Sequence, residues 1–146
     1  MAAEKRILLV DDSPNDVELV LDALEEERLS ELAFVVRDGA DALDYLFRRQ
    51  KFADLKGSLP ALILLDLKMP KVDGLEVLRQ IKEDVVLKRI PVVMMTSSRE
   101  EIDVLRSYNL GANSYVVKPI NFQEFVTAVK KVGAYWILHN AIPPSG

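Results

Sequence analysis

The sequence predicts an α/β domain with a parallel β-sheet at its centre and helices on both faces of that sheet. Short continuous apolar runs recur along the chain, and segments with helical spacing of apolar residues separate them. Runs of this length are typical of strands that are buried on both faces. Strict alternation of strand and helix places such strands side by side in one parallel sheet.

The apolar runs predict five strands. These are Ile7–Val10, Phe34–Val36, Leu62–Leu65, Val92–Met95 and Tyr115–Val117. A helix is expected after each strand, and the first begins at Ser13–Pro14, a good N-cap followed by proline at the first helical position. The apolar positions that mark the five helices are Val17, Val20, Leu21 and Leu24; Leu43, Leu46 and Phe47; Leu75, Leu78 and Ile81; Ile102 and Leu105; and Phe122, Phe125, Val126, Val129 and Trp136.

Length and composition narrow the class of protein. The 146 residues fit a single domain over 1–146, with a core over 5–139 and a C-terminal tail at 140–146. A net charge of −4 argues against nucleic acid as a partner. The absence of cysteine excludes a disulfide framework and thiolate metal sites. No signal peptide and no apolar run long enough to span a membrane are found, so we expect a cytoplasmic location without membrane partners.

Polar side chains follow four of the five predicted strands. Asp11 and Asp12 follow the first strand, Asp66 the third, Thr96 the fourth and Lys118 the fifth. Ligands bind at the carboxyl ends of the strands in open parallel sheets, and those ends meet at one edge. Each residue alone could be a turn residue, a helix cap or a solvated lysine. Their coincidence at one edge indicates a site.

The chemistry of this set points to phosphoryl transfer. Carboxylates packed together repel one another unless a cation joins them, and Mg²⁺ prefers oxygen ligands. Mg²⁺ with a nearby Lys and Thr suits a phosphoryl group, whose oxygens they neutralise or hydrogen-bond. An aspartate can itself accept the phosphoryl group. Asp66, held at the end of the apolar strand Leu62–Leu65, is the candidate acceptor.

Four segments resemble a response-regulator receiver domain. They read LLVDDSPND over 8–16, LILLDLKMPKVDG over 62–74, PVVMMTS over 91–97 and GANSYVVKP over 111–119. Their order and spacing are similar to those of the family across almost the whole chain. The resemblance implies a flavodoxin-like, receiver-type fold, with five helices on both faces of a five-stranded parallel sheet. The strand order would be 2-1-3-4-5, numbered along the chain.

The resemblance also implies the ligands of the metal. Asp66 would be the phosphoacceptor. Mg²⁺ would be bound by the side chains of Asp12 and Asp66 and by the backbone carbonyl of Lys68, with Asp11 acting mainly through water.

Three further residues are implied to act on the phosphoryl group or in the switch. Thr96 would contact the phosphoryl group and move on activation, and Lys118 would pair with a phosphoryl oxygen. Tyr115 would be the aromatic residue whose rotamer is coupled to Thr96. The family switches by a population shift between inactive and active conformations.

A second resemblance is to the stand-alone regulators paired with bacterial and cyanobacterial phytochromes. It rests on the long segment 52–60, the run KRIPVVMMTSS and the ending AYWILH. It implies a single-domain regulator that is phosphorylated by a sensor histidine kinase of phytochrome type and signals through its own surface. Such a protein is not an enzyme beyond its own phosphoryl transfer and dephosphorylation. A homodimer through the fourth helix, fifth strand and fifth helix is also implied, whereas the downstream target is not identified.

Two alternatives stay open. A receiver-like docking module that works without phosphorylation is one, although the complete set of polar residues speaks against it. The other is a phosphatase with an aspartate nucleophile, of the haloacid-dehalogenase type. Its nucleophile lies on the first strand in an Asp-x-Asp pattern, whereas the candidate here follows the third strand and reads Asp-Leu-Lys.

Overall fold

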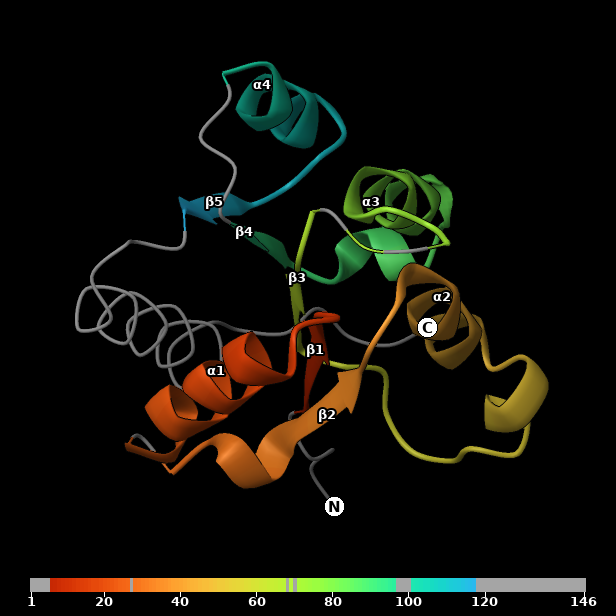
Figure 1. The fold of residues 1–146 in the computed structure, drawn as a ribbon. Coiled ribbons are helices and arrows are strands. Elements are labelled where there is room, and N and C mark those ends of the chain that lie inside the picture. Colours follow the sequence, from red (N-terminus) through yellow and green to blue (C-terminus); the bar gives the residue numbers. More distant parts are fainter. Residues whose placement is uncertain (1–5, 27, 68, 70, 97–100, 118–146) are drawn as a thin grey trace.

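Five parallel strands form the single sheet of the described structure (Figure 1). The computed structural model describes residues 6–26, 28–67, 69, 71–96 and 101–117. The strand order is β2-β1-β3-β4-β5, which confirms the expected fold and order. The strands are β1 (Ile7–Val10), β2 (Ala33–Val36), β3 (Leu62–Leu65), β4 (Val92–Thr96) and β5 (Ser114–Val117).

The helices alternate with these strands as expected. They are α1 (Pro14–Glu26), α2 (Gly39–Phe47), α3 (Gly74–Glu83) and α4 (Glu101–Asn109). Three short 3₁₀ turns, which the apolar pattern did not predict, are η1 (Ser30–Leu32), η2 (Gln50–Phe52) and η3 (Leu87–Arg89). The fifth helix expected over 122–136, and the tail at 140–146, lie outside the described residues.

The start of α1 shows why the sequence begins a helix there. The Ser13 side-chain oxygen accepts a hydrogen bond from the backbone N–H of Asp16, at 3.3 Å. The Ser13 carbonyl accepts the first helical bond from the N–H of Val17, at 3.0 Å. Proline at position 14 loses nothing, because the N–H it lacks would have no helical partner in the first turn.

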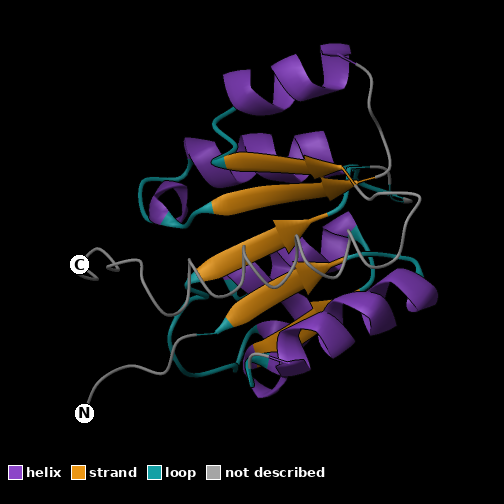
Figure 2. Ribbon diagram, turned by 90° about the vertical axis from the view of Figure 1, so that its left-hand side faces the viewer, coloured by secondary structure: helices purple, strands orange, loops and turns teal. Residues whose placement is uncertain are grey.

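The sheet has a separate apolar layer on each face. Every residue of β1 and β3 is buried, because successive side chains point to opposite faces and both faces are covered. Leu8 and Val10 pack with residues of α2 and α3, whereas Ile7 and Leu9 pack with residues of α1. Figure 2 shows the helices on the two sides of the sheet. Burial on both faces accounts for the continuous apolar runs in the sequence.

The long connection after α2 is closed by aromatic packing. Phe34 of β2 stacks on Tyr45 of α2 with ring centroids 4.8 Å apart, and Phe52 of η2 meets Tyr45 edge-on at 5.4 Å. These contacts hold η2 against the outer strand, while residues 53–58 of the connection are exposed. Among the described residues, no helix is both long and apolar enough to cross a membrane.

Candidate functional site

The structure brings Asp11, Asp12 and Asp66 together at the carboxyl edge of the sheet. One carboxylate oxygen from each residue lies within 4.8 Å of those of the other two. Asp11 and Asp12 directly follow β1, Asp66 directly follows β3, and these neighbouring strands pair in register from Ile7 with Leu62 onward. Asp11 and Asp66 are buried, whereas Asp12 is exposed. The cluster therefore has a closed inner side and an open outer side.

Backbone hydrogen bonds hold the two buried aspartates in place. The N–H of Asp66 donates to the carbonyl of Val10 at 2.9 Å, and the N–H of Asp11 donates to the carbonyl of Val36 at 3.1 Å. These bonds extend the sheet by one residue beyond each strand. The positions of Asp11 and Asp66 are therefore set by the rigid sheet rather than by a loop.

Local N–H groups orient the same two carboxylates. Oδ1 of Asp66 accepts from the N–H of Leu67 at 2.9 Å, and Oδ1 of Asp11 accepts from the N–H of Ser13 at 3.0 Å. These bonds therefore fix the direction in which each carboxylate points.

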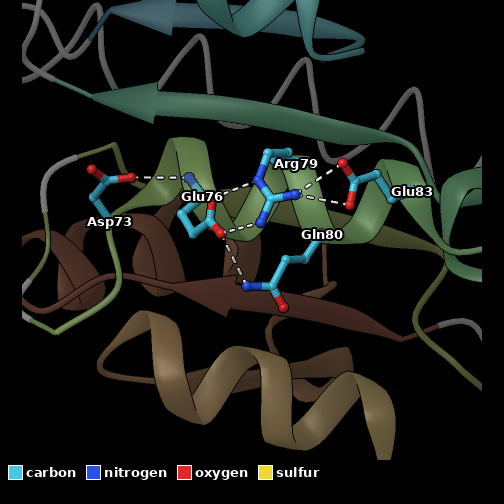
Figure 3. A network of polar contacts seen from close by, with 5 residues as sticks. All are labelled: Asp73, Glu76, Arg79, Gln80 and Glu83. Atoms are coloured by element: carbon cyan, nitrogen blue, oxygen red, sulfur yellow. Dashed lines mark hydrogen bonds and ion pairs between the residues drawn. The ribbon is translucent and has the colours of Figure 1, made fainter.

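The segment after Asp66 turns back toward the sheet before α3 begins. The N–H of Gly74 donates to the carbonyl of Leu67 at 2.6 Å. The Asp73 side chain then caps α3 by accepting from the N–H of Glu76 at 2.9 Å (Figure 3). We call the described residues of this segment, 67, 69 and 71–73, the β3–α3 loop. Its two ends are thus joined beside Asp66.

The backbone places Thr96 and Tyr115 near this edge. Thr96 is the last residue of β4, one residue beyond the strand end expected from the sequence, because it still pairs with Val117 of β5. Leu65 pairs with Met94 across β3 and β4, so Thr96 and Asp66 both lie at the carboxyl ends of adjacent strands. Tyr115 pairs with Met94 from the other side.

Part of the expected site falls outside the described residues. Lys68 and Lys118 lie outside the described residues, as do the side chains of Thr96 and Tyr115. The described part of the site is therefore the acidic cluster together with the backbone positions of Thr96 and Tyr115.

Two glycines are close to the site in ways that the sequence did not reveal. A Cβ on Gly74 would lie 2.1 Å from the carbonyl oxygen of Asp66, and a Cβ on Gly39 would lie 2.0 Å from that of Val72. Both distances are far below contact distance, so neither position can carry a side chain without backbone movement. The only sequence signal was that each glycine follows an aspartate that caps a helix.

A second charged group lies on the exposed side of α3 and has a different character. Arg79 pairs with Glu76 and Glu83 on its own helix, and Gln80 also donates to Glu76 (Figure 3). The hydrogen bonds from Arg79 hold the pKa of Glu76 well below its usual range. Opposite charges satisfy one another here, at spacings typical of a solvated helix face. Glu76 and Glu83 share one arginine, so this network has a formal net charge of −1, against −3 for the three aspartates of the acidic cluster.

The acidic cluster has the chemistry of a divalent cation site. It offers carboxylate oxygens from a rigid edge, and the exposed Asp12 gives access from solvent. Hard divalent cations such as Mg²⁺ and Mn²⁺ are bound by such oxygens and keep several water ligands when few carboxylates are present.

The chain matches the family model described as response regulator receiver domain over residues 7–130. Response regulator Rcp1 of Synechocystis sp. (strain ATCC 27184 / PCC 6803 / Kazusa) is 39% identical over 139 residues, covering 95% of this chain and 93% of Rcp1.

Solved structures show the same similarity. The phosphorylated cyanobacterial phytochrome response regulator RcpA is 40% identical with a TM-score of 0.89, covering 97% of this chain and 100% of RcpA. The Mn²⁺-bound form of Rcp1 is 38% identical with a TM-score of 0.89 and the same coverage of each chain, 97% and 100%. The bacteriophytochrome response regulator RtBRR is 55% identical with a TM-score of 0.76, covering 96% of this chain and 84% of RtBRR.

Proposed function

This chain belongs to the response regulator receiver domain family of phosphorylation-based two-component signalling, and we propose that Asp66 is its phosphoacceptor. Asp66 alone of the three clustered aspartates follows the central strand β3, where it is buried and held by the backbone of β1. The exposed Asp12 then lies on the side from which a cation would approach, whereas Asp11 is buried.

Mg²⁺ is the cofactor that we propose. The side chains of Asp12 and Asp66 and the backbone carbonyl of Lys68 would bind it, and Asp11 would act mainly through water. The Mn²⁺-bound structure of the similar protein Rcp1 supports a divalent cation, and both cations prefer oxygen ligands. When bound, the cation neutralises charge on the oxygens of the incoming phosphoryl group.

The proposed reaction transfers a phosphoryl group from a phosphohistidine of the kinase. A carboxylate oxygen of Asp66 forms a bond to phosphorus while the P–N bond to the histidine breaks. The imidazole nitrogen keeps the electron pair of the broken bond and takes up a proton. Lys118 pairs with one phosphoryl oxygen and the hydroxyl of Thr96 hydrogen-bonds another, which offsets the charge on the group as it moves. The product is an acyl phosphate on Asp66.

We propose that Thr96 and Tyr115, which lie on the paired strands β4 and β5, form the switch. Phosphorylation draws Thr96 toward Asp66, and the Tyr115 side chain changes rotamer with it. Phosphorylation then favours the active conformation, which shifts the population without any further reaction. Thr96 pairs with Val117 of β5, and Tyr115 pairs with Met94 of β4; a change at Thr96 would therefore reach the α4–β5 surface over a short path.

The proposed kinase is a sensor histidine kinase of phytochrome type. The similarity to the regulators RcpA and RtBRR, whose names refer to phytochromes, supports this partner. We also propose a homodimer through α4, β5 and the expected fifth helix, a cytoplasmic location, and a single domain over 1–146. The chain would catalyse nothing beyond its own phosphoryl transfer and dephosphorylation.

Intact mass spectrometry after incubation with acetyl phosphate and Mg²⁺ tests the acceptor. We expect the wild type to gain one phosphoryl group that is lost in base. Asp66→Asn keeps the size of the side chain and should gain none, whereas Asp54→Asn, at an exposed position, should behave as wild type. Phosphorylation of Asp66→Asn at the wild-type rate would refute the assignment and place the acceptor elsewhere, whereas a wild type that gains no phosphoryl group would favour a docking module.

Phosphotransfer from a panel of purified histidine kinases tests the partner. We expect kinases of phytochrome type to phosphorylate the chain much faster than the others in the panel. Equal rates from all kinases, with Asp66 still the acceptor, would contradict the phytochrome partner alone.

A further inference from the structure

The β3–α3 loop rests against the first residue of α2. A Cβ on Gly39 would lie 2.0 Å from the carbonyl oxygen of Val72 and 2.9 Å from its Cβ. Gly39 is buried and Val72 is half-buried, so the contact between these two residues is shielded from solvent. Gly39 does not have the positive φ that would itself call for glycine. Glycine is therefore needed at position 39 because a side chain there would collide with the loop backbone.

Asp38 ties the same helix end to the same loop. Its Oδ1 caps α2 by accepting from the N–H of Asp41 at 2.7 Å, and its Oδ2 lies 3.5 Å from Nζ of Lys71. Lys71 has a left-handed backbone with φ 67°, which is unfavourable for a residue with a side chain. The Lys71 side chain is 69% exposed, so the ion pair contributes little to stability. Its effect is to favour one position of the loop over others.

Apolar side chains of the loop also pack against α2. Met69 and Val72 pack against the buried cluster that contains Leu67 of the loop and Ala42 and Leu43 of α2. The loop is therefore held on the α2 side by a backbone contact, an ion pair and apolar packing.

The other side of the loop bears directly on Asp66. The N–H of Gly74 bonds to the carbonyl of Leu67 at 2.6 Å, and a Cβ on Gly74 would lie 2.1 Å from the carbonyl oxygen of Asp66. The backbone at the start of α3 is therefore in direct contact with the backbone of Asp66. A movement of Val72 therefore has a short path, through Asp73 and Gly74, to the carboxylate that joins the acidic cluster.

We infer that Gly39 is a positioning residue for the phosphoacceptor site. Its bare Cα allows α2 to hold the β3–α3 loop in the place that keeps Asp66 aligned with Asp11 and Asp12. This inference rests on the proposed function, because it assigns Gly39 an effect on cation binding and phosphorylation at Asp66. Gly39 itself touches neither the cation nor the phosphoryl group.

Mn²⁺ binding to Gly39→Ala tests the inference, with the free cation measured by electron paramagnetic resonance. We expect Mn²⁺ affinity to fall about tenfold to a hundredfold, the range seen when residues behind metal ligands are changed. Phosphorylation by acetyl phosphate at limiting Mg²⁺ should slow by a similar factor. Both measurements are made under conditions in which circular dichroism shows that all variants are fully folded.

Ala40→Gly is the matched control, because it weakens the same helix end by removing an atom rather than adding one. We expect it to bind Mn²⁺ as tightly as wild type. If Ala40→Gly loses as much affinity as Gly39→Ala, general weakening of α2 explains the effect and the inference is wrong. If Gly39→Ala binds Mn²⁺ and accepts phosphate like wild type, the inference is also wrong, while the proposed function stands.

Hydrogen exchange of the wild type gives a test that does not depend on folding of a variant. The amides of Asp41 and Ala42 both bond to Asp38, to its side chain and its carbonyl respectively. Addition of Mg²⁺ should slow their exchange together with that of the β3–α3 loop, and Asp66→Asn should show much less protection. Protection of the loop without any at Asp41 and Ala42 would overturn the inference. A wild type that binds no Mn²⁺ would overturn the proposed function as well.

Discussion

Gly74 lies directly against the backbone of Asp66, so that a Cβ at position 74 would stand 2.1 Å from the carbonyl oxygen of Asp66. The same glycine is the first residue of α3. The beginning of a helix and the proposed phosphoacceptor are therefore in contact without an intervening side chain. Any residue larger than glycine has to displace one of them.

Gly74→Ala should destabilise the protein by about 1–3 kcal/mol, as overpacking of a filled site does. Helix propensity alone predicts the opposite sign, since alanine is favoured over glycine in helices by about 1 kcal/mol. Urea unfolding followed by circular dichroism therefore separates the two effects. Gly57→Ala is a control for backbone strain, because its φ is +112° and a Cβ there would meet nothing within 4 Å. A Gly74→Ala protein as stable as wild type would contradict the close contact.

Asp12→Ala should weaken Mg²⁺ binding and slow phosphorylation, because one carboxylate ligand is lost. Without metal, the variant should be at least as stable as wild type, since repulsion within the acidic cluster is reduced. With Mg²⁺ at a hundred times the wild-type Kd, the wild type should gain about 2.7 kcal/mol, and the variant should gain less because its Kd is higher. Thermal unfolding with and without Mg²⁺ measures this, with the exposed Asp54→Ala as control. An equal gain for Asp12→Ala and wild type would exclude Asp12 as a ligand.

Thr96→Ala should separate phosphorylation from switching. The variant keeps Asp66 and should still accept phosphate, although more slowly than wild type, because one hydrogen bond to the phosphoryl group is lost. The amide chemical shifts of Ser114–Val117 should change much less on phosphorylation than in wild type. Thr96→Ser retains the hydroxyl and should respond like wild type. A full response of Thr96→Ala in β5 would show that the signal takes another route.

Lys82→Met should remove two hydrogen bonds from the turn before β4. Nζ of Lys82 donates to the carbonyl oxygens of Lys88 at 3.1 Å and Ile90 at 2.9 Å. Methionine keeps the apolar stem but not the donor, and we expect a loss of about 1 kcal/mol for the unsatisfied carbonyls. Urea unfolding at neutral pH measures the loss, and Lys88→Met, at an exposed position, is the control.

The same lysine should leave a signature in the pH dependence of stability. Burial lowers the pKa of Lys82 below its usual 10.5. Between the lowered pKa and 10.5, the unfolded chain still binds a proton that the folded chain has lost, so this group makes stability rise with pH. Wild type should therefore gain stability relative to Lys82→Met as the pH is raised through this interval. Parallel stability curves for the two proteins would contradict the lowered pKa.

Tyr135→Ala/Leu138→Ala should weaken the proposed homodimer. These residues and Ile142 are apolar in addition to the positions that the helical spacing assigns to the core. Their structure lies outside the described residues, so the prediction rests on the sequence. Analytical ultracentrifugation over a concentration series, with and without phosphodonor, measures association. A wild type that stays monomeric at high micromolar concentration in both states would exclude the dimer, and an unaffected double variant would place the interface elsewhere.

The strands and the order of elements could be predicted from the sequence alone, because strands that are buried on both faces appear in it as continuous apolar runs. Ile7–Val10 and Leu62–Leu65 were predicted with the bounds that the structure shows. Other strands extend one residue further, as at Ala33, Thr96 and Ser114. The ends of these strands are set by backbone pairing with a neighbouring strand. This pairing cannot be predicted from the identity of a single residue.

The meeting of Asp11, Asp12 and Asp66 could also be expected from the sequence, since parallel strands bring their carboxyl ends to one edge. The contacts of Gly39 with Val72 and of Gly74 with Asp66 could not. A glycine has no side chain to form a pattern, and its role here depends on how closely two backbones approach after folding. The bonds from Lys82 to two carbonyls likewise required the tertiary structure, because a lysine in a helix looks the same in sequence whether its ammonium is solvated or bonded.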